Sequence, residues 1–262
     1  MIIYQRLLNL LETCPRKFQH IYLEQLDSPL TPAQQERPWG SRFHLLMQQR
    51  ELGLPIDLLV RENSQMKNCF TAFLKAAPEI FAPNRDSETF RQAEYSRTMD
   101  FKGYVLTVVY DLLIADAKKA QILDWKTYPH PQEQQKLAQN WQTRLYLYVL
   151  AETSEYLPEQ ISMTYWFVRT NKGERPQRLT FDYNKEQHKK TEKYLTMWLE
   201  RLKDWLDKYM EKGEQFPQVD PNSRKCIDCK FAIRCERSRI QKEEAIALTA
   251  YSNLANIEEI CL

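Results

Sequence analysis

The sequence predicts a mixed α/β fold in which helices flank a central sheet. Three observations support this prediction: strand-like segments alternate with helical ones, glycine is scarce, and apolar residues suffice for a sizeable core. Only 5 of the 262 residues are glycine, far below the roughly 7% of an average chain, which fits poorly with a turn-rich all-β fold. Hydrophobic residues make up 43%, and the order helix–strand–strand–strand–helix–strand–strand–helix is typical of a sheet covered by helices.

The few glycines also exclude several nucleotide-binding and catalytic loops. They stand at positions 40, 53, 103, 173 and 213, so no two of them lie close together in the chain. A Walker A loop, a GxGxxG dinucleotide turn and a GxSxG nucleophile elbow all need closely spaced glycines. The usual nucleotide-binding folds and the α/β-hydrolases are therefore excluded.

Charge and hydropathy limit the partners and the location. Lys plus Arg number 37 against 35 Asp plus Glu, a net charge of +2, so any contact with nucleic acid would come from local patches. No run of about 18 apolar residues is present, which excludes a membrane-spanning helix. The first residues lack a basic segment followed by a small-residue cleavage site, so we expect no secretory signal and a cytoplasmic location.

Apolar periodicity and residue type predict each element in chain order. Short helices are expected on both sides of a break at the first cysteine, and longer helices before and after a central group of strands. Val, Ile, Leu, Thr and Tyr dominate that central group. The expected helices cover 2–12, 16–26, 38–53, 56–77, 132–153, 185–211 and 237–259, with a polar, proline-containing break at 78–87. The expected strands cover 89–99, 104–116, 120–127, 159–169 and 175–183.

Three of the six cysteines are spaced as ligands of a metal or a cluster. Cys226, Cys229 and Cys235 form a C-x2-C-x5-C pattern, in which two thiolates on one tight turn can reach the same centre. Cys14 is the best candidate for a fourth ligand, because a proline follows it and the next two residues are cations that offset thiolate charge. Chance clustering of free thiols is the alternative. Zinc and a [4Fe–4S] cluster both suit four cysteines, and spacing alone does not separate them.

The other two cysteines are expected to take no part in that centre. Cys69 lies within a helical pattern, where a free cysteine behaves as a small hydrophobic residue. Cys261 is the penultimate residue of the sequence, in a segment that matches no motif.

Two predicted strands joined by a polar turn carry the most informative pattern. Asp116 and Lys119 bound a tight turn, and with the turn centred between them, Asp111 and Asp124 become cross-strand partners. Their Cβ atoms would then lie about 4.5–5.5 Å apart. Lys126 stands two residues beyond Asp124 and therefore points to the same face of the sheet.

Facing carboxylates in apolar strands repel each other and lose solvation, so they require a cation. A hard divalent ion, Mg²⁺ or Mn²⁺, between Asp111 and Asp124 with Lys126 alongside resolves the conflict. Such a site activates water and neutralises charge on a phosphodiester, and Lys126 would orient the water or stabilise the transition state. The alternative is an aspartate in water at a frayed strand end, which is common for one acid but not for two acids and a lysine on one face.

This pattern resembles the D…(D/E)xK signature of the PD-(D/E)xK nuclease superfamily. In its RecB-like branch a DYKT-like strand motif precedes a helical QxxxY, which residues 124–127 and the pair Gln142 and Tyr146 match. That branch also carries an upstream helical histidine, matched by His44. Some members add CPrkF and C-x2-C-x5-C, matched by residues 14–18 and the three C-terminal cysteines. The chain is therefore similar to iron–sulfur RecB-like nucleases, which include CRISPR-associated exonucleases, exonuclease V and the AddB nuclease domain.

The resemblance implies a role for each matched residue. The metal ligands would be His44, Asp111, Asp124 and the carbonyl of Trp125. Lys126 would be catalytic, Gln142 and Tyr146 would line the site and contact DNA, and a [4Fe–4S] cluster would be held by Cys14, Cys226, Cys229 and Cys235. Trp125 replaces the more common tyrosine, with its side chain expected to point away from the site, and the usual glycine before Asp111 is absent. Glu94, in the preceding strand, is a further acid that this assignment leaves out of the site.

The resemblance also implies the fold, the domains and the activity. The fold would be restriction-endonuclease-like, a mixed central sheet flanked by helices, with an N- plus C-terminal helical subdomain clasped by cysteines. That iron–sulfur clasp would comprise residues 1–37 and 213–262, and the nuclease core residues 38–212 with a helical insertion at about 54–85. The activity would be that of a metal-dependent DNA exonuclease acting on single-stranded ends, with a helicase or CRISPR adaptation proteins as partners. The alternative is a non-catalytic iron–sulfur DNA-binding or scaffold subunit of a DNA repair or CRISPR adaptation complex, which would have no need for facing carboxylates.

Overall fold

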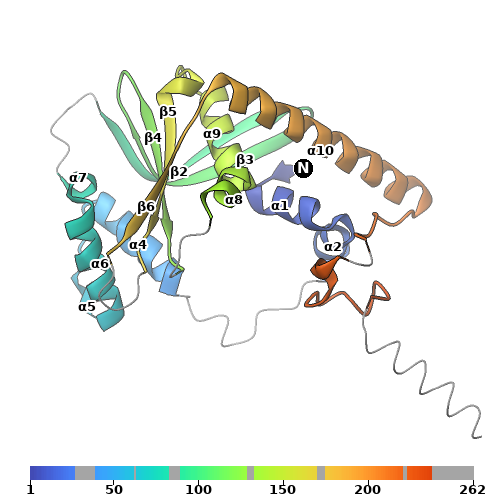
Figure 1. Ribbon diagram of the computed structural model, residues 1–262, viewed down its shortest axis with the longest axis horizontal. Coiled ribbons are helices and arrows are strands. Elements are labelled where there is room, and N and C mark those ends of the chain that lie inside the picture. The colour runs from blue at the N-terminus through green and yellow to red at the C-terminus, as the bar shows by residue number, and fades with distance from the viewer. Residues whose placement is uncertain are drawn as a thin grey trace, which may run out of the picture. The chain divides into compact units, whose positions relative to one another are not determined.

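The computed structural model describes residues 1–26, 39–61, 63–82, 89–128, 133–169, 175–220 and 223–237 (Figure 1). The chain divides into two compact units. The first comprises Met1–Asn9 with Pro29–Arg201, and the second comprises Leu10–Ser28 with Leu202–Leu262. The boundary between them falls inside two helices, α1 (Gln5–Thr13) and α10 (Lys185–Lys212). No helix in the described ranges is long and apolar enough to cross a membrane.

The first unit contains a mixed sheet of six strands. Strands run in the order β1-β3-β4-β5-β6, and β2 also pairs with β3. The pairs β1–β3 and β4–β5 are parallel, whereas β2–β3, β3–β4 and β5–β6 are antiparallel. The strands are β1 (Ile2–Ile3), β2 (Phe90–Phe101), β3 (Tyr104–Ala115), β4 (Ala120–Lys126), β5 (Ile161–Phe167) and β6 (Gln177–Asp182). The chain therefore has the mixed α/β architecture that the sequence predicts.

A tight turn sets the register between β3 and β4. Asp116 Oδ1 accepts hydrogen bonds from the N–H groups of Lys118 and Lys119, at 2.7 and 3.0 Å. The four pairs that follow run from Ala115↔Ala120 to Leu112↔Leu123, which confirms the predicted register. Asp111 and Asp124 stand one position beyond the last of these pairs.

One face of the sheet packs against helices α4 (Trp39–Glu51), α6 (Ser64–Ala76) and α7 (Pro78–Phe81), as Figure 1 shows. Aromatic side chains dominate the contact, because the Phe73 ring lies 5.4 Å from the Trp125 ring and 5.2 Å from the Trp166 ring. The indole of Trp125 is therefore part of the core on this face. The neighbouring helix α5 (Asp57–Arg61) has no fully buried side chain.

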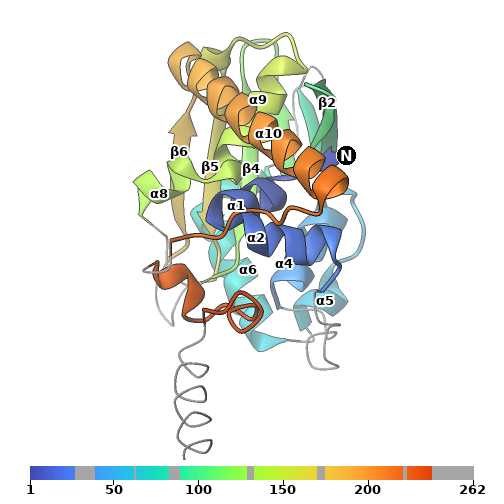
Figure 2. The ribbon, with the colours of Figure 1, turned by 90° about the vertical axis from the view of Figure 1, so that its right-hand side faces the viewer.

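Helix α9 (Trp141–Glu152) covers the other face of the sheet and contacts β2, β3 and β5 (Figure 2). Short helix α8 (Gln134–Gln139) precedes it. The two are separated by Asn140, whose side chain accepts a 2.8 Å hydrogen bond from the N–H of Gln142 and so caps α9. The single helix expected over 132–153 is therefore wrong, because this asparagine starts a new helix.

The N-terminal helix α1 is bonded to the start of α9 within the first unit. Asn9 Nδ2 donates to Asn140 Oδ1 at 3.3 Å, and Asn9 Oδ1 accepts from the N–H of Trp141 at 3.4 Å. Farther along the two helices, Gln5 Nε2 donates to the hydroxyl of Tyr146 at 3.3 Å. These contacts tie the helix that carries the QxxxY pair to the N-terminal segment.

The second unit has a small aromatic core. Phe216 stacks against Phe18 at 5.9 Å between ring centroids and contacts Trp205 at 5.7 Å. Phe18 belongs to α2 (Pro15–Phe18), and the π-helical turn η1 (Gln19–Leu23) begins with Gln19, whose Oε1 accepts the N–H of Phe216 at 2.7 Å. The 3-10 turn η3 (Arg224–Cys226) lies farther along the same unit. Cys14 caps α2, because its Sγ accepts the N–H of Lys17 at 3.4 Å.

Several expected boundaries differ from the structure. The first helix starts later than position 2, since Ile2–Ile3 pairs with β3, and the helix expected over 56–77 is divided into α5 and α6. The segment 16–26 forms α2 and a π-helical turn, and one helical turn, α7, lies inside the expected break at 78–87. The helix expected over 237–259 lies almost wholly outside the described residues.

Candidate active site

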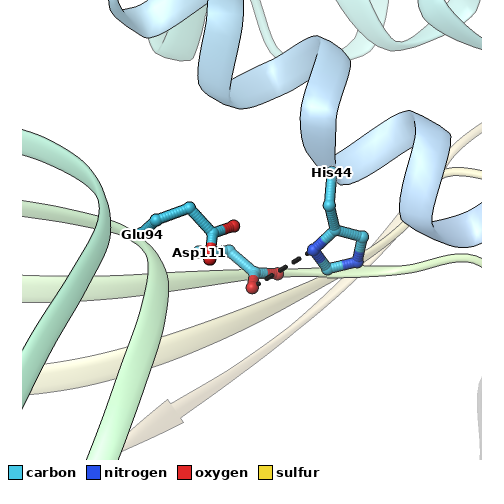
Figure 3. Close-up of side chains that lie close together, drawn as sticks. All are labelled: His44, Glu94 and Asp111. Atoms are coloured by element: carbon cyan, nitrogen blue, oxygen red, sulfur yellow. Dashed lines mark ion pairs between the residues drawn. The ribbon is translucent and has the colours of Figure 1, made fainter.

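Three acids, Glu94 in β2, Asp111 in β3 and Asp124 in β4, occupy adjacent positions on neighbouring strands of the sheet. In β2 and β3 the pairs Ala93↔Leu112 and Tyr95↔Tyr110 leave Glu94 opposite Asp111. Glu94 has a φ of +49°, a left-handed conformation that is uncommon for a residue with a side chain. In Figure 3 the carboxylates of Glu94 and Asp111 lie beside each other and face His44 of helix α4.

His44 connects α4 to the acids and to β4. Its Nδ1 lies 3.3 Å from Asp111 Oδ1, and its Nε2 donates to the carbonyl oxygen of Trp125 at 3.0 Å. Ligand atoms of His44, Glu94 and Asp111 all fall within 4.8 Å of one another. Burial opposes a charge on the imidazole, but the hydrogen bond to Asp111 and the surrounding carboxylates outweigh it and raise the pKa of His44 to about 9.

Close packing at Gly40 holds His44 in this position. A Cβ atom built on Gly40 would lie only 2.6 Å from Oγ1 of Thr127, the residue that follows β4. His44 stands one helical turn after Gly40 and on the same face of α4, because residues four apart share a face. The absence of a side chain at position 40 therefore lets the start of α4 approach the end of the strand that carries Asp124.

Asp124 is buried, and each of its carboxylate oxygens lies against a polar side chain. Lys126 Nζ lies 2.6 Å from Oδ1, and Gln142 Nε2 donates to Oδ2 at 2.6 Å. Lys126 Nζ also donates to Gln142 Oε1 at 2.7 Å, which closes a three-membered network. Burial and then the charge of Asp111 raise the pKa of Asp124 to about 6, although Lys126 opposes the shift.

The remaining predicted residues lie around this network. Asp111 Oδ2 accepts the N–H of Trp125 at 2.6 Å, so its carboxylate links β4 to His44. Tyr146 is only 4% exposed, and the charges of Asp124 and Asp111 add to burial in raising its pKa well above the ordinary value. Its hydroxyl accepts from Gln5 rather than meeting solvent.

The donor set fits a hard divalent ion. Carboxylate oxygens and a backbone carbonyl are ligands that suit Mg²⁺ or Mn²⁺, whereas an imidazole is a ligand shared with softer transition metals. Asp124 Oδ1 is buried and accepts no hydrogen bond of regular geometry in the described part of the chain. Its polar partner there is the ammonium group of Lys126, with which it forms an ion pair. The close group of potential ligands contains Glu94 beside His44 and Asp111, whereas Asp124 is engaged by Lys126 and Gln142.

The four cysteines predicted as ligands line one small cavity in the second unit, together with Phe231. Burial raises the pKa of the Cys235 thiol, Arg16 lowers it, and the thiols of Cys14, Cys229 and Cys226 raise it further, as mutual neighbours do. Among the described residues, the five cysteines at 14, 69, 226, 229 and 235 form no disulfide. Cys69 is buried in α6, and position 261 lies outside the described residues.

A buried histidine also contacts one of these cysteines. His20 Nε2 lies 3.6 Å from Cys235 Sγ, and His20 Nδ1 lies 2.8 Å from a carboxylate oxygen of Glu24. The imidazole therefore has an acid at one ring nitrogen and a thiol at the other.

Comparison with known proteins identifies a family. A family model described as the PD-(D/E)XK nuclease superfamily matches residues 5–236, most of the chain. The chain belongs to the PD-(D/E)XK nuclease superfamily. As a member of this superfamily it is a nuclease. The substrate of such a nuclease is a phosphodiester of DNA, and its cofactor is a divalent metal.

Two solved structures resemble this PD-(D/E)XK nuclease. The protein SSO0001 is 14% identical with a TM-score of 0.42, and the match covers 88% of this chain and 84% of that one. A protein from Eubacterium rectale, provisionally called an exonuclease, is 10% identical with a TM-score of 0.45, covering 79% of this chain and 77% of that one. No curated protein gives a significant match.

Sequence reasoning left out two residues that the structure places at these centres. Glu94 lies across from Asp111, and the signal available was its position in the strand that precedes β3. His20 had a weaker signal, because only its spacing of six residues from Cys14 relates it to the cysteines. A lone histidine or glutamate is more often a surface or packing residue, so neither stands out without the tertiary contacts.

Proposed function

We propose that this nuclease is a Mg²⁺- or Mn²⁺-dependent DNA exonuclease that acts on single-stranded ends. The observation that carries the proposal is the network of Asp124, Lys126 and Gln142, placed beside the contact between Asp111 and His44. A buried carboxylate with a raised pKa next to a second carboxylate is typical of a catalytic site.

Each residue of the site has a definite task in this proposal. His44, Asp111, Asp124 and the carbonyl of Trp125 would hold the divalent ion, which when bound supplies positive charge to the phosphodiester oxygens. Lys126 Nζ is held by Asp124 and Gln142, so its ammonium group can orient the attacking water and stabilise negative charge that develops on the phosphate.

We further propose that the chain is of the RecB-like iron–sulfur type. Cys14, Cys226, Cys229 and Cys235 would hold a [4Fe–4S] cluster in the clasp of residues 1–37 and 213–262, with zinc as the alternative occupant. Four free thiols around one cavity support this assignment. Absorbance near 400 nm and iron content in anaerobically purified protein would support the cluster, and zinc without iron would contradict it.

Cleavage of end-labelled DNA tests the activity. Single- and double-stranded substrates are incubated with Mg²⁺ or Mn²⁺, and we expect the wild type to shorten the single strand progressively from an end. Lys126→Ala should abolish cleavage without loss of fold, whereas the exposed Lys136→Ala in α8 serves as a control for loss of one positive charge. Equal turnover by Lys126→Ala and wild type would contradict the site. Binding of DNA without cleavage by the wild type would favour a scaffold role instead.

A further inference from the structure

A cleft of about 920 Å³ adjoins the candidate active site. Its walls include His44 and Glu94 from the site, Thr127 at the end of β4, and Trp39 and Arg169, neither of which any motif singled out. Arg169 is the only arginine or lysine among the described residues that line this cleft. Arg169 therefore stands in the same cleft as His44 and Glu94, which belong to the group of potential metal ligands. This combination suggests that the cleft receives a substrate with more than one negative charge.

The backbone places Arg169 next to the catalytic strand. The N–H of Val168 donates to the carbonyl oxygen of Lys126 at 3.0 Å, so the chain after β5 continues along β4. Val168 is fully buried, which anchors this part of the backbone, and Arg169 is the next residue. The arginine therefore extends from a fixed position beside Lys126.

An aromatic ring holds the guanidinium. Arg169 Cζ lies 5.6 Å from the centroid of the Trp39 ring, and Trp39 itself stacks on Phe43 of the same helix at 5.6 Å. Such stacking occupies a flat face of the guanidinium and leaves the N–H groups at its edge free to donate. No carboxylate of the described residues forms an ion pair with Arg169, so none of these residues competes for this edge.

We propose that Arg169 binds the backbone phosphate that flanks the scissile phosphodiester, and that Trp39 positions it for this contact. The inference rests on the proposed nuclease function of the same site. The guanidinium presents paired donors that match two oxygens of one phosphate. The scissile phosphate would bind at the acidic residues of the site, and the neighbouring phosphate of the same strand would bind at Arg169.

The proposal distinguishes substrates with and without a flanking phosphate. Arg169→Gln should lower kcat/KM about 10- to 100-fold on a short oligothymidylate, because a charge-assisted hydrogen bond to phosphate is lost. The same variant should cleave thymidine 5′-(p-nitrophenyl phosphate) within about twofold of the wild type, because this ester has one phosphodiester only. Arg169→Lys should lie between the two, since it keeps the charge but not the paired donors.

Binding in the presence of a chelator gives a readout that is independent of cleavage. The slope of log K against log salt for oligothymidylate should fall by about 0.7 in Arg169→Gln, as expected for one lost phosphate contact on a single strand, and stay unchanged in Arg169→Lys. Arg178→Gln is the matched control, because Arg178 also lies over a tryptophan, Trp166 at 5.8 Å, but in a different hollow. This control should bind and cleave as the wild type does.

Two results would overturn the proposal: unchanged oligonucleotide binding and cleavage in Arg169→Gln, or equal losses on both substrates. If the wild type cleaves neither substrate, the proposed nuclease function fails, yet the salt slope still decides whether Arg169 contacts a phosphate. Trp39→Leu should weaken oligonucleotide binding in the same direction, with thermal melting as the check on its fold.

Discussion

Asp124 combines a buried carboxylate with an acidic neighbour, and this makes the metal-free protein sensitive to pH. The folded pKa of about 6 is above the ordinary value of 3.8, so the folded state binds more protons than the unfolded state between these values. The free energy of unfolding should therefore fall as pH rises through this window. Denaturant titrations with a chelator should show the fall in the wild type, and Asp124→Asn should lack it. An identical pH dependence in both proteins would contradict the assignment.

Gly40 supports the site because it has no side chain, so that α4 can pack closely against Thr127. Gly40→Ala would place a methyl group 2.6 Å from Thr127 Oγ1, so α4 must move away from β4 and carry His44 with it. We expect at least a tenfold loss of kcat/KM and weaker Mn²⁺ binding. Gly40→Ala combined with Thr127→Ala removes the contacting hydroxyl and should restore part of both. Thr127→Ala alone keeps Gly40 and is the matched control for loss of the hydroxyl. Full activity in Gly40→Ala would show that the packing does not position His44.

At the scale of elements, the pairing of β3 with β4 was predictable because a tight turn leaves only one register for the residues beside it. Asp116 accepts two backbone N–H groups within that turn, and this chemistry is visible in the sequence. The place of Glu94 was not predictable, because it depends on a left-handed φ in the middle of a strand and on a helix that arrives from elsewhere in the chain. The break before α9 had a signal that the apolar periodicity concealed, namely an asparagine in a helix-capping position.

The cap of α9 links helix stability to the site. Asn140→Ala should cost about 1 kcal/mol, because the N–H of Gln142 loses its acceptor. That loss corresponds to a melting temperature lower by about 2–4 °C for a domain of this size. The fall in kcat should be larger than the fraction of unfolded protein accounts for, because Gln142 orients both Asp124 and Lys126. Asn140→Asp keeps the acceptor and should retain most stability. If Asn140→Ala lowered stability but left kcat unchanged, the cap would be purely structural.

At the scale of the whole molecule, the cysteine centre should contribute to folding. Cys226→Ala should lose the bound metal or cluster and melt at a lower temperature, because the binding energy of such centres is folding energy. Cys69→Ala should leave the metal content unchanged, because Cys69 is buried in α6 of the first unit. Metal analysis with thermal melting checks both variants. Loss of metal from Cys69→Ala but not from Cys14→Ala would identify a different fourth ligand.

The family and the candidate residues were within reach of the sequence because several spaced motifs occur in one order. The motifs did not reveal three contacts that surround the motif residues. Gln5 contacts Tyr146, His20 contacts Cys235, and Trp39 lies against the guanidinium of Arg169. Each of the three joins residues far apart in the chain, and none follows a local spacing rule. Such contacts depend on tertiary packing, which periodicity and composition do not encode.

The division of the chain into two interleaved units has a practical meaning for modular engineering. Neither unit corresponds to a contiguous stretch of sequence, because each alternates with the other along the chain. A single cut therefore yields no fragment that contains one complete unit alone, and recombination at one crossover cannot exchange either of them. Grafting the four-cysteine centre into another scaffold would require transplanting two separate segments together, one with Cys14 and one with the remaining three thiols.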